Sequence, residues 1–461
     1  MEDIFTIFLR NVFEIFFSKI KIKEKKCDLL KINFVISVPN NFTYLQRKLV
    51  EKIFLTHLFN NNTTKNKKGE NKSNIYYYGK NKIENIQIKN IKIENCSNLG
   101  FLYNYQKLSE NNKNKNILVI NIEGSSVNIS LISTFPQTFL KNIRKSENIN
   151  KYEIKDIKCA SFGEEDFTDN FESIYINESQ IKEYNKYPTS LAQLRQIIDT
   201  TKKNFYKKNQ NEIILKNFCD KNEVKISMNK KDFEMSCKAQ FDKIVELIND
   251  LLKQSSISEN KIDDIIFIGN TTSINIIKEK IQNIFKNKNK KLYEKLLENP
   301  INENKYDEIN PNLIVLGAVI QSYNLFSNKE KTLYKYKEIT PISFGIEGIN
   351  NKIEFMIKKG SQLPIKTNKL IKFKRTNDKK VKINIYEGEE EYSYKNRLIS
   401  NAEMDIENIE NEMKSKDYVE IMIQFLLNQN FELRVFILDS KTSKRKMEFL
   451  INIDIVHDKN I

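Results

Sequence analysis

Several residue types are scarce in this chain of 461 residues, which has no tryptophan, 2 histidines, 5 cysteines, 7 prolines and 11 glycines. Zinc sites are built mainly from clustered histidines and cysteines, and no two of these cysteines form a C-x-x-C pair, so we expect no metal centre. The odd number and wide spacing of the cysteines favour free thiols in a reducing compartment over a disulfide framework: Cys27, Cys96, Cys159, Cys219 and Cys237.

The sequence also lacks an apolar run long enough to cross a membrane, which needs roughly 20 apolar residues. Its most apolar stretch, IFTIFLRNVFEIFF at 4–17, is interrupted by Arg10, Asn11 and Glu14. The apolar positions of this stretch follow helical spacing, which favours a packed helix over a signal peptide. We therefore expect a cytoplasmic protein with no membrane partner.

Charge of one sign is in excess, since 76 lysines and arginines against 60 aspartates and glutamates give a net charge of +16. A basic surface can attract ribosomal RNA or anionic lipid. The basic residues are spread along the chain rather than gathered in a stripe, and asparagine, lysine and isoleucine, which share AT-rich codons, abound. Compositional drift on a solvated surface is therefore the alternative explanation of the charge.

The first two thirds of the chain alternate strand-like and helix-like segments, which indicates an α/β fold. The expected strands are 31–39, a pair within 116–135, and 264–269. The expected helices are 43–54 with Thr43 as cap, 188–205 with Thr189 or Ser190 as cap, 233–252, 276–285 and 311–326. Residues 59–87 predict a low-complexity insertion, and its part 60–82, which is rich in asparagine, lysine, glycine and serine, predicts a mobile loop.

After about Ile339 apolar and polar residues alternate with the period of a strand. Such runs occupy 381–385, 419–425, 431–437 and 447–453, and the polar residues 428–430 predict a hairpin. Runs of this kind indicate an all-β sandwich. We therefore predict an α/β domain at 1–327, a linker at 328–339 and a β-sandwich at 340–461.

The segment NILVINIEGSSVNISLI at 116–132 carries a candidate site. Two β-branched runs around the turn Glu123–Ser126 predict two strands joined by a tight turn, which can cradle a phosphate with backbone N–H groups. The turn has a single glycine, and asparagines stand at 121 and 128 where a metal or phosphate site would use carboxylates. An ordinary hairpin turn is therefore the alternative.

Eight phrases follow one another in order: VPNNFTYLQR at 38–47, NIEGSSVNIS at 121–130, FGEEDF at 162–167, FEMSCKAQFDKIVELINDLL at 233–252, IDDIIFIGNTTSI at 262–274, INPNLIVLGAVIQ at 309–321, TPISFGIE at 340–347 and NIYEGE at 384–389. These phrases resemble those of the 70-kDa heat-shock (DnaK-type) chaperones. The resemblance implies an actin-like ATPase domain, followed by a β-sandwich that binds nascent or unfolded polypeptide. It also implies a J-domain co-chaperone as a partner.

The same resemblance implies a nucleotide site at the residues that match the family's phosphate and adenosine contacts: Gly124, Ser125, Ser126, Asp199, Lys202, Lys203, Gly269, Asn270 and Thr271. Asn95 stands in place of the catalytic glutamate, Asn121 in place of a metal-side aspartate, and Ser126 in place of a threonine. Asn121 cannot supply the charge that holds Mg²⁺, and Glu123 adds negative charge beside the phosphates. We therefore expect weak ATP binding at most, no tightly held magnesium and no efficient hydrolysis. Solvated lysines on a helix face are the alternative for Lys202 and Lys203.

Two larger departures concern the ends of the chain. It starts past the family's first phosphate loop, which implies a truncated gene model or half a nucleotide site, and it stops after the last β run without a helical lid. A lidless β domain beside a degraded ATPase domain resembles the ribosome-associated Ssz-type branch. We therefore predict a chaperone or co-chaperone at the ribosome. The rivals are an ATP-hydrolysing chaperone with further sequence upstream of Met1, and a non-catalytic scaffold that docks on RNA or the ribosome.

In the β-sandwich, seven apolar residues are candidates to line the peptide groove, with sandwich core as the alternative for each of them: Ile346, Phe355, Ile357, Leu363, Ile365, Leu370 and Phe373.

Overall fold

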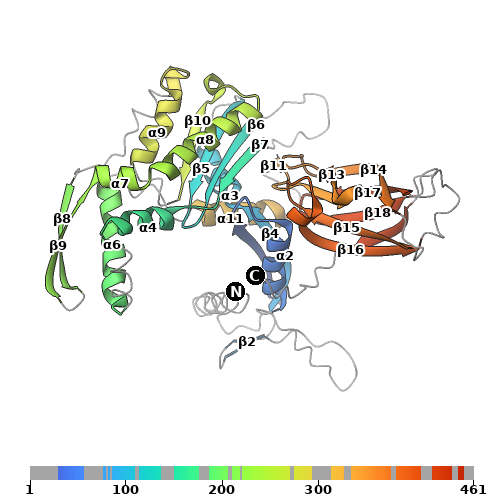
Figure 1. Cartoon of the computed structure of the whole chain (residues 1–461), viewed down its shortest axis with the longest axis horizontal. Helices are drawn as coiled ribbons and strands as arrows, with labels where there is room; N and C mark the ends of the chain where they lie inside the picture. The colour runs from blue at the N-terminus through green and yellow to red at the C-terminus, as the bar shows by residue number, and fades with distance from the viewer. Residues whose placement is uncertain are drawn as a thin grey trace.

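A computed structural model of the chain describes residues 30–56, 76–78, 81–83, 86–108, 114–135, 150–175, 186–205, 210–218, 221–269, 275–292, 313–326, 334–374, 380–405, 418–438 and 445–450. Along the chain an α/β part precedes a two-sheet β-sandwich, and the two parts lie side by side (Figure 1). This is the order of fold classes that the sequence predicted.

A five-stranded sheet in the order β10-β5-β6-β7-β11 forms the centre of the α/β part. Its strands are β5 (Lys115–Ile122), β6 (Val127–Phe135), β7 (Asn150–Ala160), β10 (Asp264–Ile268) and β11 (Tyr334–Lys337). β5, β6 and β7 form an antiparallel meander, while β10 joins β5 and β11 joins β7 in parallel. The strand pair predicted within 116–135 is confirmed, and its β-branched residues suit strands that are buried on both faces.

Helices cover both faces of this sheet. α8 (Lys238–Gln254) packs on β6 and β7 on one face. On the other face lie α3 (Cys96–Leu108) and α11 (Leu313–Phe326), which share a core with β5. The two helices cross closely at Gly317, where a Cβ atom would lie 1.8 Å from the Leu99 carbonyl oxygen. Any side chain at this position would therefore push α11 away from α3.

A two-stranded parallel sheet is formed by β1 (Leu30–Val38) and β4 (Ile86–Asn95). α2 (Tyr44–Thr56) packs against it through an apolar cluster, and α11 lies beside β1. Thr43 Oγ1 accepts a hydrogen bond from the Gln46 N–H at 3.3 Å, and Gln46 Oε1 accepts one from the Thr43 N–H at 2.9 Å. This reciprocal cap fixes the start of α2. The strand predicted at 31–39 and the capped helix at 43–54 are both confirmed.

The other elements of the α/β part are α4 (Glu164–Tyr175), α6 (Pro188–Asn204), β8 (Gln210–Phe218), β9 (Lys221–Asn229), α7 (Lys230–Ser236) and α9 (Asn275–Phe285). The helix predicted at 188–205 is confirmed, but Tyr187 is its cap position rather than Thr189 or Ser190, because Pro188 already occupies the first helical turn. The single helix predicted at 233–252 is wrong. α7 and α8 are separated at Cys237, whose φ of −104° and ψ of 9° are not helical.

The sandwich consists of two four-stranded sheets in the orders β13-β12-β15-β16 and β14-β17-β18-β19. The strands are β12 (Phe344–Glu347), β13 (Ile353–Ile357), β14 (Ile365–Lys374), β15 (Lys380–Glu387), β16 (Arg397–Asp405), β17 (Tyr418–Leu427), β18 (Leu433–Leu438) and β19 (Arg445–Leu450). Apolar side chains of β12 to β18 meet in one core, in which Ile383 and Ile423 are fully buried. The hairpin predicted at 428–430 is confirmed between β17 and β18.

The insertion at 59–87 is described only in part. Within it β2 (Tyr76–Tyr78) and β3 (Asn81–Ile83) form an antiparallel pair, and β4 already begins at Ile86. The expectation of a loop is therefore wrong at these residues, since aromatic and β-branched side chains favour strands there. The helix expected at 4–17 lies outside the described residues. Among the helices that the structure does describe, none combines the length and the apolar character of a membrane span.

Candidate functional site

The turn that joins β5 to β6 lies where the sequence predicted a phosphate loop or a hairpin. The Glu123 N–H donates to the Ser126 carbonyl oxygen at 2.9 Å, which closes the turn. The N–H groups of Glu164 and Glu165 donate to the carbonyl oxygens of Glu123 and Gly124, each at 2.9 Å. The turn thereby satisfies the first N–H groups of α4, which a helix start otherwise leaves unpaired.

Two glycines bring neighbouring backbone segments close to this turn. A Cβ atom at Gly163 would lie 2.0 Å from the Glu123 carbonyl oxygen, and one at Gly269 would lie 2.1 Å from the Ile122 carbonyl oxygen. Gly269 also has a φ of +89°, a conformation that glycine adopts readily and other residues do not. The end of β10 therefore lies directly beside the end of β5. Asn270 and Thr271, which follow Gly269, lie outside the described residues.

A buried cluster of amide and hydroxyl side chains lies next to the turn. We name it the amide network, and each member is at most 5% exposed: Asn40, Ser97, Asn121, Ser126, Asn128 and Ser130. Asn40 Nδ2 donates to Ser97 Oγ and to Ser130 Oγ, both at 3.0 Å. Asn128 Oδ1 accepts from the Asn40 N–H, and Asn128 Nδ2 donates to Ser126 Oγ, both at 3.0 Å. Because Asn40 follows β1 and Asn128 lies in β6, the network ties the two sheets together.

Asn121 occupies the position at which a metal-side carboxylate was expected. Its Nδ2 donates to Cys96 Sγ at 3.0 Å and to Glu123 Oε1 at 3.1 Å, while its Oδ1 is buried without a hydrogen-bond partner in the described part of the chain. Burial raises the pKa of the Cys96 thiol, and the negative charge of Glu123 raises it further. The thiol is therefore neutral at physiological pH, and the amide is held between two protein acceptors.

Lys202 is a buried lysine on α6. Its ammonium forms an ion pair with Asp199 at 2.7 Å, donates to Thr168 Oγ1 and lies 3.9 Å from Glu164 Oε1. The alternative of a solvated lysine is wrong here, because folding brings α4 against α6 and encloses the side chain, which is 1% exposed. The side chain of Lys203 is outside what the structure describes. The charges of Asp199 and Lys202 thus neutralise each other beside the first turns of α4.

The structure brings several of the expected nucleotide residues close together, and the side chains of the amide network among them are neutral. Magnesium is usually held through carboxylates, whereas the members of the amide network are neutral. They donate to one another or, in the case of Asn121, to Cys96 and Glu123. The nearby cation of Lys202 is already neutralised by two carboxylates. In the part of the chain that the structure describes, no group of three or more His, Cys, Asp or Glu side chains could hold a metal ion.

Asn95, at the position of the expected catalytic glutamate, is 1% exposed and belongs to a second polar cluster. Its Oδ1 accepts a hydrogen bond from Arg47 Nη2 at 2.5 Å, and Arg47 Nε donates to the Phe42 carbonyl oxygen at 3.0 Å. The Arg47 guanidinium also lies over the ring of Phe431 in the sandwich, 4.6 Å from its centroid. Arg47 therefore connects Asn95 to the β-sandwich. The sequence reasoning missed this residue, although an arginine at the end of the phrase VPNNFTYLQR was an available signal.

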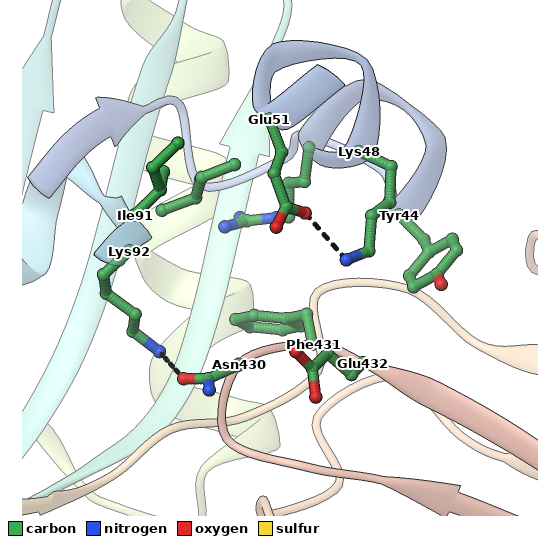
Figure 2. A pocket seen from close by; sticks show the side chains of 10 residues that line it. Tyr44, Lys48, Glu51, Ile91, Lys92, Asn430, Phe431 and Glu432 are labelled. Carbon is green, nitrogen blue, oxygen red and sulfur yellow. Dashed lines mark hydrogen bonds and ion pairs between the residues drawn. The ribbon is translucent and has the colours of Figure 1, made fainter. Parts of the chain in front are cut away.

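Figure 2 shows the pocket that α2, β4 and the β17–β18 turn form at this junction. The cavity measures about 50 Å³ and is lined by charged and aromatic side chains, including Lys48, Glu51 and Phe431. Lys92 Nζ donates to the Gln429 carbonyl oxygen at 2.7 Å and to Asn430 Oδ1 at 3.0 Å. These bonds attach the β17–β18 turn to β4.

A second attachment lies at the start of α2. Glu387 Oε2, at the end of β15, accepts a hydrogen bond from the Tyr44 N–H at 2.9 Å. The rings of Tyr44 and Phe344 meet edge to face, with centroids 5.9 Å apart. A carboxylate of the sandwich thereby satisfies a helix N-terminus of the α/β part, where negative charge is favourable.

The segment predicted as a linker contributes β11. The Tyr336 ring stacks on Tyr152 with a centroid distance of 5.2 Å and an interplanar angle of 7°, and its hydroxyl donates to Glu94. Glu94 also accepts from Gln321 Nε2 at 3.0 Å, and Lys337 forms an ion pair with Glu153 at 2.8 Å. The segment that connects the two parts is thus bound to the central sheet along 334–337.

The seven groove candidates divide into two groups. Ile346, Ile357, Leu363 and Phe373 are buried in the sandwich core. Phe355 and Ile365 are half-buried, and Leu370 is 43% exposed. These three lie on β13 and β14, edge strands of the two sheets that lie beside each other and are linked by the ion pair of Lys369 with Glu354.

Comparisons with known proteins agree with this architecture. The family model described as Hsp70 protein matches residues 103–459. One curated relative, "Heat shock cognate 70 kDa protein 3" of Dictyostelium discoideum, is 21% identical over 328 residues, which cover 70% of this chain and 48% of the relative. The chain thus spans about half the length of the curated relative it matches. The mixed sheet with its helices, followed by a β-sandwich, fits the actin-like ATPase fold and the substrate-binding fold of that family. The chain therefore belongs to the Hsp70 family.

Proposed function

We propose that this chain is a chaperone-like protein that binds unfolded or nascent polypeptide without turning over ATP. The observation that carries the proposal is the amide network, which places neutral and mutually hydrogen-bonded side chains where magnesium triphosphate would need anionic ligands. Removing a single positioned charge-stabilising group costs on the order of 10²–10³ in rate. Asn95 and Asn121 both stand where the family has acidic residues, so the expected loss in rate is larger than for one replacement.

Nucleotide affinity is weak for a related reason. The Lys202 ammonium already has Asp199 and Glu164 as partners, so it would have to give up a buried ion pair before it could meet a phosphate. The ammonium is fully buried, whereas the side chains of Asp199 and Glu164 are 46% and 17% exposed, so the cost lies in separating a buried cation from its partners. The Glu123 carboxylate adds repulsion at the same turn.

The junction supports a function that does not depend on nucleotide. Arg47, Lys92 and Tyr44 on the α/β side each meet a partner in the sandwich, and Tyr336 holds the connecting segment on the central sheet. All of these contacts are made between side-chain and backbone groups of the chain itself. We expect the α/β part to act as a scaffold that holds the β-sandwich in one position.

The polypeptide site that we propose lies along the edge strands β13 and β14. An extended peptide can pair its backbone with a strand edge. Its apolar side chains would meet Leu370 on the outer face of β14, while the half-buried Ile365 lies on the inner face against the sandwich core and Phe355 lies on β13. These are the groove candidates that folding leaves accessible at least in part.

Fluorescence anisotropy of a labelled apolar heptapeptide tests the proposal. We expect saturable binding that Mg-ATP does not reverse, and an affinity at least about tenfold weaker in Leu370→Asp, because a buried leucine contributes about 1.5–3 kcal/mol. Leu398→Asp is the matched control, since Leu398 on β16 is 44% exposed and is not a groove candidate. Absence of peptide binding, or equal affinities in both variants, would contradict the proposed site.

Ribosome association, a J-domain partner and a cytoplasmic location form the finer part of this proposal. They are supported by the resemblance to the Ssz-type branch and by the net charge of +16. A non-catalytic scaffold that docks on ribosomal RNA is the second candidate, which the same charge favours. Salt-sensitive sedimentation with ribosomes in a peptide-binding-deficient Leu370→Asp variant would favour the scaffold over the chaperone.

A further inference from the structure

α11 exposes an apolar stripe on the side opposite to Gly317. Val315, Val319 and Tyr323 are 60%, 62% and 46% exposed, and their spacing of four residues places them along one face of the helix. None of the 14 residues of α11 is charged. In a chain of which 30% is charged, this helix therefore has no polar outer face of the usual kind.

The stripe is more than a set of scattered surface residues. Its three side chains follow one another along the helix. Leu325, at the end of the helix, is an additional exposed apolar residue, with 39% of its surface exposed. A continuous apolar patch of this kind marks an interface. The patch lies on a helix that packs beside β1, the strand that follows the N-terminal segment of the chain.

The N-terminal segment 4–16 has the complementary pattern. Ile4, Phe8, Val12 and Ile15 recur at helical spacing. As a helix this segment of 13 residues would be about 20 Å long, close to the roughly 21 Å of α11. A helix of this length needs tertiary packing of its apolar face to be stable in water.

The connection between the two elements is long enough. Residues 17–29 join the segment to Leu30, where β1 begins. Thirteen residues can extend over roughly 45 Å, which is about twice the length of α11. The segment can therefore reach the stripe in either direction along the helix.

We propose that residues 4–16 fold as an amphipathic helix that covers the Val315–Tyr323 face of α11. The segment thereby covers the exposed face of α11, and residues 17–29 join it to β1. This inference does not depend on peptide binding or on the nucleotide site.

A photoreactive benzoylphenylalanine in place of Val319 tests the proposal in the full chain. After irradiation, mass spectrometry should find the cross-link within one chain and in a peptide from residues 4–16. The matched control carries the same probe in place of Ile214, which is 51% exposed on β8, and should give no cross-link to 4–16. Cross-links from position 319 to a second copy of the chain, to other segments only, or to nothing would overturn the proposal.

Hydrogen exchange gives a second readout that does not need the probe. Val319→Asp should speed exchange of residues 4–16 about tenfold, because the apolar contact of one buried valine is lost. Ile214→Asp should leave that exchange unchanged. Equal exchange of the segment in both variants would also overturn the proposal, and since both positions are exposed, neither change disturbs the core.

Discussion

Replacement of Glu338 by glutamine tests whether a buried charge at the junction makes the stability of the chain depend on pH. Glu338 is 2% exposed and is surrounded by Glu94, Arg47 and Lys92. One carboxylate oxygen accepts a hydrogen bond from the Ile339 N–H at 3.1 Å, and the other has no partner in the described part of the chain. Burial, together with the negative charge of Glu94, raises the pKa of Glu338 from 4.5 to about 7.

The sign of the effect follows from the direction of this shift. A carboxyl group whose pKa is raised on folding binds its proton more tightly in the folded state, so it favours folding at low pH. That contribution is complete below pH 4.5 and is lost as the pH rises to about 7. Since one pKa unit corresponds to 1.36 kcal/mol, the loss amounts to about 3 kcal/mol. Glutamine keeps the acceptor for Ile339 and does not titrate.

Urea unfolding of the parent and of Glu338→Gln at pH 5 and pH 8 measures the effect. All other titrating groups are common to both proteins, so the difference between their unfolding free energies isolates Glu338. Between pH 5 and pH 8 this difference should change by about 3 kcal/mol in favour of the variant. Glu391→Gln is the control, because its ion pair with Lys352 is exposed to solvent, so the difference between the unfolding free energies should be nearly the same at both pH values. A difference that is the same at both pH values would refute the reasoning.

Three further substitutions test the amide network, the connecting strand β11 and the attachment of the β17–β18 turn to β4. Asn121→Asp places a buried carboxylate beside the half-buried Glu123, and urea unfolding should show a loss of about 3–5 kcal/mol; an unchanged midpoint would contradict the buried network. Tyr336→Phe removes the hydrogen bond to Glu94, and proteolysis of the 328–339 segment should quicken, in line with a loss of about 2 kcal/mol; equal cleavage rates would argue against a bound connecting strand. Lys92→Met removes two hydrogen bonds to the β17–β18 turn, and hydrogen exchange of residues 428–432 should rise about tenfold; unchanged exchange would contradict this attachment.

The sequence predicted well those elements whose cause is local. The strands within 116–135 follow from a β-branched run on both sides of a turn, and the start of α2 follows from Thr43 and Gln46, three residues apart. The alternation after Ile339 predicted the sandwich for the same reason, since a strand with one buried face shows its pattern directly.

The features that the sequence did not predict depend on distant partners. Lys202 is buried because Thr168 and Glu164, on another helix, surround it. β11 is a short basic and aromatic segment that becomes a strand only beside β7. The role of Arg47 depends on Phe431, which folding brings from the far end of the chain. No local pattern encodes such pairs.

The candidate site shows the same limit. The family's motif pointed to the neighbourhood of Asn121, Gly124 and Gly269, and the structure places these residues at adjacent strand ends. The motif could not indicate that Asn40, from the phrase VPNNFTYLQR, forms hydrogen bonds with Asn128 and Ser130. The polar character of the site was therefore predictable, whereas its internal pairing was not.

Calorimetric titration of the chain with Mg-ATP, combined with a steady-state phosphate-release assay, tests the central claim most directly. The account predicts weak or no saturable heat and no phosphate release above the uncatalysed background. The same measurements on any longer form of the protein would show whether additional sequence changes the site. Tight magnesium-dependent binding with steady turnover by this chain alone, lost on substitution of Ser126, would contradict the account.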